Sequence, residues 1–207
     1  MSREFVGFDP QELEIRQAHA LLNACVAPRP IALTSTVSLS GCANLAPFSY
    51  FMAGGGSPLS IAISPGLNRH GEPKDTLRNL VETGEFVVNL VTPDMLDPMN
   101  RTSTELPYGE SEWELSGLTP APSVYVAPAR VLESPISLEC RLFHLLPHGD
   151  GPGSANYVIG EVVYIHAAAD TLVDGRPDSS RLQYLGRLDG EWYTVVDERN
   201  RVRKARP

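Results

Sequence analysis

The feature that most constrains the fold is a series of short runs rich in β-branched residues, each closed by turn-forming residues. These runs lie at 31–37, 58–64, 85–91, 124–126, 136–146, 157–169 and 192–196. Val, Ile and Thr favour pleated strands, whereas Gly, Pro, Asn and Asp end them. Helical periodicity is confined to 9–22, 76–83 and 92–104, and the first of these helices is expected to begin at Asp9-Pro10. The pattern predicts a mainly β protein, an antiparallel barrel with a few short helices, rather than a doubly wound sheet.

The stretch 27–52, APRPIALTSTVSLSGCANLAPFSYFM, predicts a strand, a tight turn and a polar loop. Gly41 can take the positive φ that such a turn requires, and the serines before it can bond local backbone. The loop Asn44–Ser49 then brings an amide, a proline and a hydroxyl close together. Alone, this stretch describes an ordinary β-hairpin with a polar loop.

A second stretch predicts a phosphate site at the start of a helix. Asp75 or Thr76 is expected to cap a helix that ends at Gly84, a residue typical of helix C-termini. Arg69 and Lys74 lie just before its first turn. Free N–H groups and cations at a helix start favour an anion.

The two stretches together, RPIALTSTVSLSGCANLAPFSYF and SPG…RHGEPKDTLRNLVETGEFVVNLV, resemble the flavin reductase-like family of FMN-binding split-barrel proteins. The later segments IGEVVYIHAAADTLVDG and YLGRLDGEWYTV fit the same pattern, so the resemblance covers about residues 15–197. The resemblance implies a split β-barrel of Greek-key topology that binds FMN at the interface of a homodimer, with NAD(P)H as co-substrate.

The resemblance also implies which residues form the site. The flavin ring and ribityl chain would be held by Thr34, Ser35, Thr36, Asn44, Ala46, Pro47, Phe48 and Ser49. The phosphate end would be held by Ser64, Arg69, Lys74, Asp75 and Thr76. Tyr184 and Arg187 are further candidates, reaching the site from the partner subunit. The glycine-rich segment 53–56 would let a nicotinamide approach the exposed flavin face.

The rest of the sequence offers no other catalytic constellation. It has no GxGxxG after a strand, no GxSxG and no metal-ligand spacing among its histidines, so no metal is expected. His166 is either a satisfied core or interface histidine or a proton donor in the pocket, and we expect the former. The absence of an evident acid, base or nucleophile suits a flavoprotein, because the chemistry then belongs to the cofactor.

We expect a single domain over residues 1–207, with a core at 15–197 and a basic, solvated tail at 198–207. The segment 105–123 is either a solvated connection anchored by Trp113 or a lid near the substrate, and we expect the former. The run 157–169 is apolar on both faces, which predicts burial in the core or in a homodimer interface.

Net charge and cysteine content limit the classes of partner and the cell compartment that we expect. The net charge of −8 and pI of about 5.1 argue against nucleic-acid binding. No apolar run approaches the length of a membrane span, and the N-terminus is unlike a signal peptide. Cys25, Cys42 and Cys140 are widely spaced and fit reduced thiols, so we expect a cytoplasmic protein without membrane partners.

Three functions are compatible with this sequence. One is an NAD(P)H-dependent flavin reductase, which could supply a monooxygenase component. Another is an FMN-containing electron carrier of the flavoredoxin type, reduced by an electron-transfer protein. The last is a non-catalytic flavin-binding module, since fold alone does not fix function.

Overall fold

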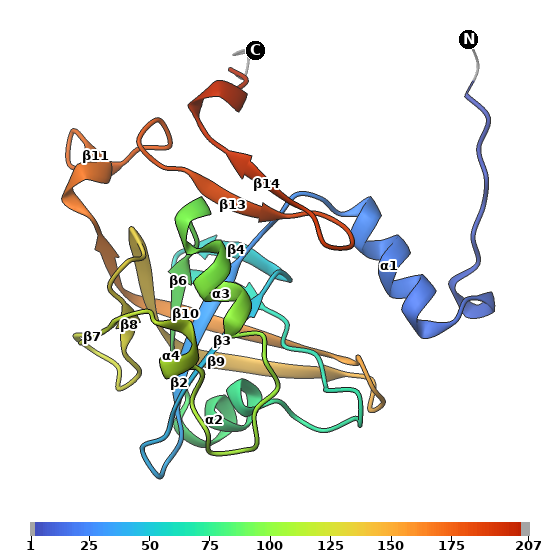
Figure 1. The fold of residues 1–207 in the computed structure, drawn as a ribbon, viewed down its shortest axis with the longest axis horizontal. Helices are drawn as coiled ribbons and strands as arrows, with labels where there is room; N and C mark the ends of the chain where they lie inside the picture. Colours follow the sequence, from blue (N-terminus) through green and yellow to red (C-terminus); the bar gives the residue numbers. More distant parts are fainter. Residues whose placement is uncertain (1–2, 204–207) are drawn as a thin grey trace.

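The computed structural model describes residues 3–203 and is organised around a curved, antiparallel seven-stranded sheet (Figure 1). The strand order is β3-β2-β6-β9-β10-β5-β4, so β3 and β4, which follow one another in the chain, lie at opposite ends of the order. The hairpin β9–β10 stands between β6 and β5. The strands are β2 (Ala32–Val37), β3 (Ala43–Phe48), β4 (Phe51–Gly56), β5 (Leu59–Ile63), β6 (Glu85–Leu90), β9 (Ile136–His148) and β10 (Ala155–Ala167).

Shorter strands form three small sheets around the main one. A three-stranded sheet joins the N-terminal and C-terminal parts of the chain, with β1 (Arg29–Pro30) paired to β13 (Tyr184–Arg187) and β13 to β14 (Tyr193–Val196). The other pairs are β7 (Pro120–Ala121) with β8 (Arg130–Val131), and β11 (Leu172–Val173) with β12 (Arg176–Pro177). This arrangement agrees with the mainly β, antiparallel fold expected from the sequence.

The helices are short and lie outside the main sheet (Figure 1). They are α1 (Ile15–Cys25), α2 (Asp75–Thr83), α3 (Leu96–Arg101) and α4 (Glu112–Ser116), with 3-10 turns at Pro10–Glu12, Pro93–Met95, Ala169–Thr171 and Glu198–Asn200. The expected helix at 9–22 is wrong in its extent: Asp9 caps only a 3-10 turn, and α1 begins after it at Ile15. None of the helices within residues 3–203 is long and apolar enough to span a membrane.

The core has two parts on opposite faces of β2. Successive side chains of a strand point to opposite faces, so Ala32 packs with Phe86 and Val158 while Leu33 packs with Met99 and others. One cluster fills the space between β5, β6, β10 and α2, and the other lies under α3 and α4. β2 is thus buried on both faces. β3 pairs with β2 along its whole length, so its residues are held against a strand that cannot shift.

Two sequence-based expectations for the region 105–126 are wrong. The segment 105–123 contains the short helix α4, whose Ser111 N-cap and Gly117 C-cap are local signals that its five-residue length obscured. The segment 124–126 is a series of bends rather than a strand. The N–H groups of Val124 and Tyr125 donate to the Glu139 carboxylate at 2.7 and 2.6 Å, which removes them from any strand ladder.

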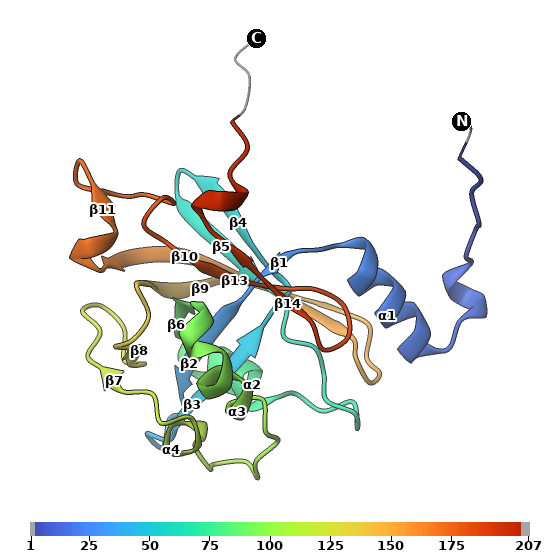
Figure 2. The same ribbon diagram turned by 45° about the horizontal axis from the view of Figure 1, so that its top comes forward.

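The ends of the chain differ from the body. The 3-10 turn Pro10–Glu12 and α1 contain no buried residue, and in two views the segment before β1 extends away from the sheets (Figures 1 and 2). In the expected basic tail, Arg199 forms an ion pair with Asp197 within a 3-10 turn, so the start of this tail is ordered rather than merely solvated. Residues 204–207 of that tail lie outside the described part of the chain.

Candidate functional site

A cavity of about 420 Å³ opens between β3, the start of α2 and the segment 102–112. These three pieces belong to different parts of the sequence, and the sheet brings them together at one end (Figure 1). The lining residues from β3 and the α2 region are Asn44, Ala46, Pro47, Phe48, Asn68, Glu72, Pro73, Lys74, Asp75, Thr76 and Arg78. Those from the segment 102–112 are Thr102, Ser103, Thr104, Glu105, Leu106, Tyr108 and Glu112.

Seven of the predicted cofactor-binding residues line this one cavity, four from β3 and three from the start of α2. They are Asn44, Ala46, Pro47, Phe48, Lys74, Asp75 and Thr76. Ser49 lies in an adjoining hollow of about 410 Å³, which shares the walls Pro47 and Ser103 with the cavity.

The start of α2 is open at the cavity. Lys74, rather than Asp75 or Thr76, is the N-cap residue, and no side chain caps the helix. The expected cap was therefore wrong by one residue. The first N–H groups of a helix have no partner within it, and a helix start carries partial positive charge. Together with the Lys74 ammonium, this end of α2 is suited to an anionic group.

A buried amide network fixes α2 against the hairpin β2–β3. The Asn44 side-chain amide donates to Thr36 Oγ1 at 3.2 Å and to Thr76 Oγ1 at 2.9 Å. The Asn79 amide also donates to Thr36 Oγ1, at 3.0 Å. Thr36 thus connects strand and helix, although it does not line the cavity.

Other predicted residues lie apart from the cavity. The Thr34 and Ser35 hydroxyls are buried and donate to the carbonyls of Ala32 and Ala129. Ser64 is buried, and its Oγ has no hydrogen-bond partner within residues 3–203. Arg69 forms an exposed ion pair with Glu105 at 3.4 Å, at the rim.

The segments proposed to meet a nicotinamide or a partner subunit also lie apart from the cavity. Ala53–Gly56 belongs to β4, the strand at the other end of the sheet from β3. Arg187 lines the adjoining hollow and stacks on Tyr193, with its guanidinium 4.4 Å from the ring centroid. Tyr184 lines a separate apolar groove beside β1.

Sequence reasoning missed the acidic wall of the cavity. Glu112 is buried, and its Oε2 accepts the Leu45 N–H at 3.0 Å. Burial raises the pKa of Glu112, and the nearby Asp75 carboxylate raises it further against that hydrogen bond. Burial likewise raises the pKa of Asp75, opposed by Arg78. The start of α2 therefore faces an acidic wall as well as the Lys74 ammonium.

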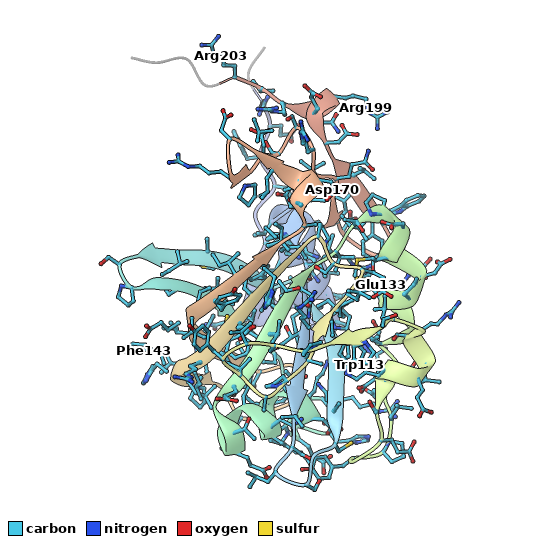
Figure 3. All side chains as sticks on the ribbon, turned by 90° about the vertical axis from the view of Figure 1, so that its left-hand side faces the viewer. Trp113, Glu133, Phe143, Asp170, Arg199 and Arg203 are labelled. Atoms are coloured by element: carbon cyan, nitrogen blue, oxygen red, sulfur yellow. The ribbon has the colours of Figure 1, made fainter. Side chains whose placement is uncertain are left out.

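The segment 102–112 lines the cavity while most of its residues stay exposed, so it is a solvated connection that also borders the site. Tyr108 lies 4.9 Å from the Arg78 guanidinium, and Cys42 Sγ lies 3.0 Å from the Gly109 carbonyl oxygen. Trp113, just beyond, is buried as an anchor (Figure 3). The position of this segment could not be derived from its polar, proline-containing sequence, because its partners lie in α2 and in the β2–β3 turn.

His166 is a paired histidine away from the cavity. Its Nε2 lies 2.6 Å from Oε1 of the fully buried Glu139. Burial alone would raise the pKa of Glu139, but hydrogen bonds from His166, Val124 and Tyr125 lower it. This geometry agrees with a satisfied core histidine. Within residues 3–203 no group of three potential metal ligands comes together.

Comparison with known proteins gives the family. The model of the flavin reductase like domain matches residues 25–182. An uncharacterized protein of Halalkalibacterium halodurans is 40% identical over 192 residues, 92% of each chain. The solved structure of nitrilotriacetate monooxygenase component B from Bacillus cereus has a TM-score of 0.90 at 34% identity, covering 97% of this chain and 100% of that one.

Two further solved structures are similar to this chain. The 2-nitrobenzoate 2-nitroreductase NbaA of Pseudomonas fluorescens has a TM-score of 0.85 at 29% identity, with 98% and 96% of the two chains covered. Flavoredoxin of Desulfovibrio vulgaris (Miyazaki F), at 23% identity and a TM-score of 0.75 over 87% of this chain and 92% of its own, shares the fold. The chain has the split-barrel fold and belongs to the flavin reductase-like family.

Proposed function

We propose that this protein binds FMN in the cavity described above and uses it to oxidise NAD(P)H. The observation that carries the proposal is the uncapped start of α2, with Lys74 beside it, opening into a cavity floored by Asn44–Phe48. An FMN molecule has an anionic phosphate at one end and a planar ring at the other. The cavity offers a cationic helix start for the former and a neutral floor for the latter.

The residues present suit the phosphate end. Lys74 and the free N–H groups at the start of α2 can donate charge-assisted hydrogen bonds to phosphate oxygens. Thr76 is held there by the hydrogen bond from Asn44. Of the four wall carboxyls, Glu112 is turned to the Leu45 N–H and Glu105 is paired with Arg69, which reduces the repulsion that they exert on a phosphate.

The floor and the adjoining hollow suit the ring and a second substrate. Ala46, Pro47 and Phe48 present small or apolar surface beside which a planar ring can lie. The hollow beyond Pro47 carries Ser49, Arg187 and the Tyr193 ring, and we assign the nicotinamide to it. A bound flavin supplies the ability to accept an electron pair as hydride; the chain orients both partners and excludes water.

The relatives support a redox role of this kind. At 34% and 29% identity, the two solved relatives named above are a monooxygenase component and a nitroreductase. By this likeness, we propose that the protein supplies reduced flavin to a separate monooxygenase component. We also propose a homodimer, because the β10 residues Tyr157, Tyr164 and Ile165 are exposed in the single chain.

The proposal is tested by mixing the FMN-loaded protein anaerobically with NADH and with NADPH in a stopped-flow spectrometer. Rapid bleaching of the flavin absorbance with either donor is expected. If both donors bleach it no faster than they bleach free FMN, the protein is not a nicotinamide-dependent reductase. An electron carrier would instead be reduced by a protein donor. A binding module would be reduced neither by a nicotinamide nor by a protein donor.

A further inference from the structure

Four buried polar side chains, called here the polar quartet, lie between the hairpin β2–β3 and α2. Thr36 and Asn44 are directly opposite each other in the register of β2 and β3, and Thr76 and Asn79 lie three positions apart on one face of α2. Each of the four is at most 4% exposed. Asn44 and Thr76 line the cavity, whereas Thr36 and Asn79 do not. Half of the polar quartet therefore lies where a ligand in the cavity would not touch it.

Hydrogen bonds join the hairpin to the helix at two points. The Asn44 amide donates to Thr76 Oγ1 at 2.9 Å, in the first turn of α2. The Asn79 amide donates to Thr36 Oγ1 at 3.0 Å, one turn further along the helix. A third hydrogen bond, from the Asn44 amide to Thr36 Oγ1 at 3.2 Å, links the two points on the hairpin side.

The apolar contacts of α2 do not fix its position in the same way. Leu77 and Leu80 pack into the cluster between α2 and the sheet. Burial of apolar surface is non-directional, so a helix held by it alone can slide or turn on the sheet. Hydrogen bonds have preferred lengths and angles, and two of them one turn apart restrict both motions. The polar quartet is thus the part of this contact that sets where α2 lies relative to β3.

The polar quartet is a poor device for stability alone. The Asn79 Oδ1 atom is buried and has no hydrogen-bond partner within residues 3–203. A buried polar atom without a partner is unfavourable, and apolar side chains of the same shape are often neutral or stabilising in such places. Because the group is incompletely paired, its position-setting hydrogen bonds account for its presence better than a gain in stability does.

The distance that the polar quartet sets is the distance between the two halves of the cavity. Thr76 lies in the first turn of α2, beside Lys74, where the phosphate is assigned. Asn44 begins the stretch of β3 whose residues 46–48 form the floor assigned to the ring. A ligand with a phosphate joined to a ring gains from both contacts only when their separation matches its own length.

We propose that Thr36 and Asn79 are positioning residues for the ligand of this cavity. Acting through Asn44 and Thr76, they hold the anion-binding start of α2 and the neutral floor of β3 at one separation. The cavity thereby selects a planar ring and a single phosphate joined by a spacer of fixed length. This inference rests on the proposed function, since it takes FMN as the ligand, and it gives Thr36 an indirect role in place of the direct contact with flavin expected from the sequence.

The first test compares the binding of FMN and riboflavin by fluorescence titration. Thr36→Val keeps the shape of the side chain and removes the hydroxyl, so FMN should bind about tenfold more weakly or worse, while the Kd of riboflavin changes less than about twofold. Thr36→Ser keeps the hydroxyl and should retain the preference of wild type for FMN. The matched control is Thr171→Val, which removes another buried hydroxyl, one that donates to the Ala168 carbonyl. It should leave both Kd values unchanged.

A second variant acts from the helix side. Asn79→Leu removes the amide that reaches Thr36 and leaves the hydrogen bonds of Asn44 in place, so it should also lower the affinity for FMN and spare riboflavin. The double variant Thr36→Val with Asn79→Leu should weaken FMN no more than the stronger single change, because both remove one shared hydrogen bond. If Thr36→Val does not fold, Asn79→Leu carries the same comparison.

The outcomes separate this inference from the proposed function. A wild type that binds FMN no more tightly than riboflavin removes the phosphate site and overturns both. A wild type that prefers FMN, with variants that keep that preference or lose both ligands equally, overturns the positioning role alone. A Thr36→Ser variant as weak for FMN as Thr36→Val also overturns it, because the hydroxyl would then not matter. None of these measurements depends on oxidation of NAD(P)H.

Discussion

At the scale of single residues, Lys74 is expected to contribute to binding of the FMN phosphate and not to binding of the flavin ring. Lys74→Ala removes the ammonium beside the start of α2, so FMN should bind about tenfold more weakly or worse, the loss of roughly one charge-assisted hydrogen bond. Riboflavin, which lacks the phosphate, should bind with nearly unchanged affinity. Fluorescence titration of both ligands measures the ratio, with Arg176→Ala, an exposed cation on β12, as the control. Equal losses for the two ligands would place the phosphate elsewhere.

Glu112 is expected to make the free energy of unfolding depend on pH. A carboxyl whose folded pKa is raised binds more protons when folded, so its contribution to stability is complete below its unfolded pKa of about 4.3 and is lost as the pH rises through the folded value. The free energy of unfolding of wild type, relative to Glu112→Gln, should therefore fall as the pH rises from about 4.3. Urea unfolding at a series of pH values measures this difference. A difference between wild type and Glu112→Gln that stays constant with pH would contradict a raised pKa for Glu112.

These residues also show where sequence reasoning ends. Lys74 was found because a cation before a helix start is a local signal. Glu112 was not, because burial and the nearby Asp75 carboxylate raise its pKa, and its partner Leu45 lies 67 positions away in the chain. Thr34 and Ser35 were assigned to the cofactor, yet their hydroxyls are occupied by main-chain carbonyls. For Ser35, whose hydroxyl meets the carbonyl of Ala129, this pairing is a tertiary contact that no short motif contains.

At the scale of secondary-structure elements, Gly160 sets the distance between β10 and the core. A Cβ added there would lie 2.4 Å from Phe86 Cζ and 2.9 Å from Cε1 of the same ring. Phe86 is fully buried, so its ring has little room to move. Gly160→Ala should therefore cost about 1–3 kcal/mol of the free energy of unfolding by overpacking. Gly151→Ala, where an added Cβ meets nothing within 4 Å, is the matched control, and a similar loss in both would argue against the packing explanation.

Most strands and helices could be predicted from local sequence patterns, and each exception has a specific physical cause. The strands β6, β9 and β10 and the helix α2 were predicted closely because their periodicity and end signals lie within them. The segment 124–126 has strand propensity but is bent by the carboxylate of Glu139, about fifteen residues away. Propensity is a weak preference, and a buried carboxylate that needs hydrogen-bond donors outweighs it.

At the scale of the whole molecule, Arg29 joins three distant parts of the chain. Besides the carbonyls at the end of α1, it donates to the Leu188 carbonyl at 2.9 Å and to Ser49 Oγ at 3.4 Å. Arg29→Lys keeps the charge but loses the planar fork, so the free energy of unfolding should fall by about 1–3 kcal/mol. Hydrogen exchange should accelerate together in α1 and in the turn 188–192, while β9 and β10 stay protected. Arg181→Lys, on the exposed surface, is the control, and exchange that rises in α1 alone would show that Arg29 does not couple the two ends.

The place of the hairpin β9–β10 in the sheet has a consequence for biosynthesis. All residues that line the cavity precede residue 113, so a ribosome completes them early. Yet β6 and β5 are joined only through β9 and β10, which end at Ala167. A nascent chain that has not reached the hairpin therefore holds two unpaired strand edges, the kind of surface on which other chains pair. The residues of the cofactor pocket are synthesised before the strands that complete the sheet supporting them, so we expect flavin to be taken up by the finished protein rather than during its translation.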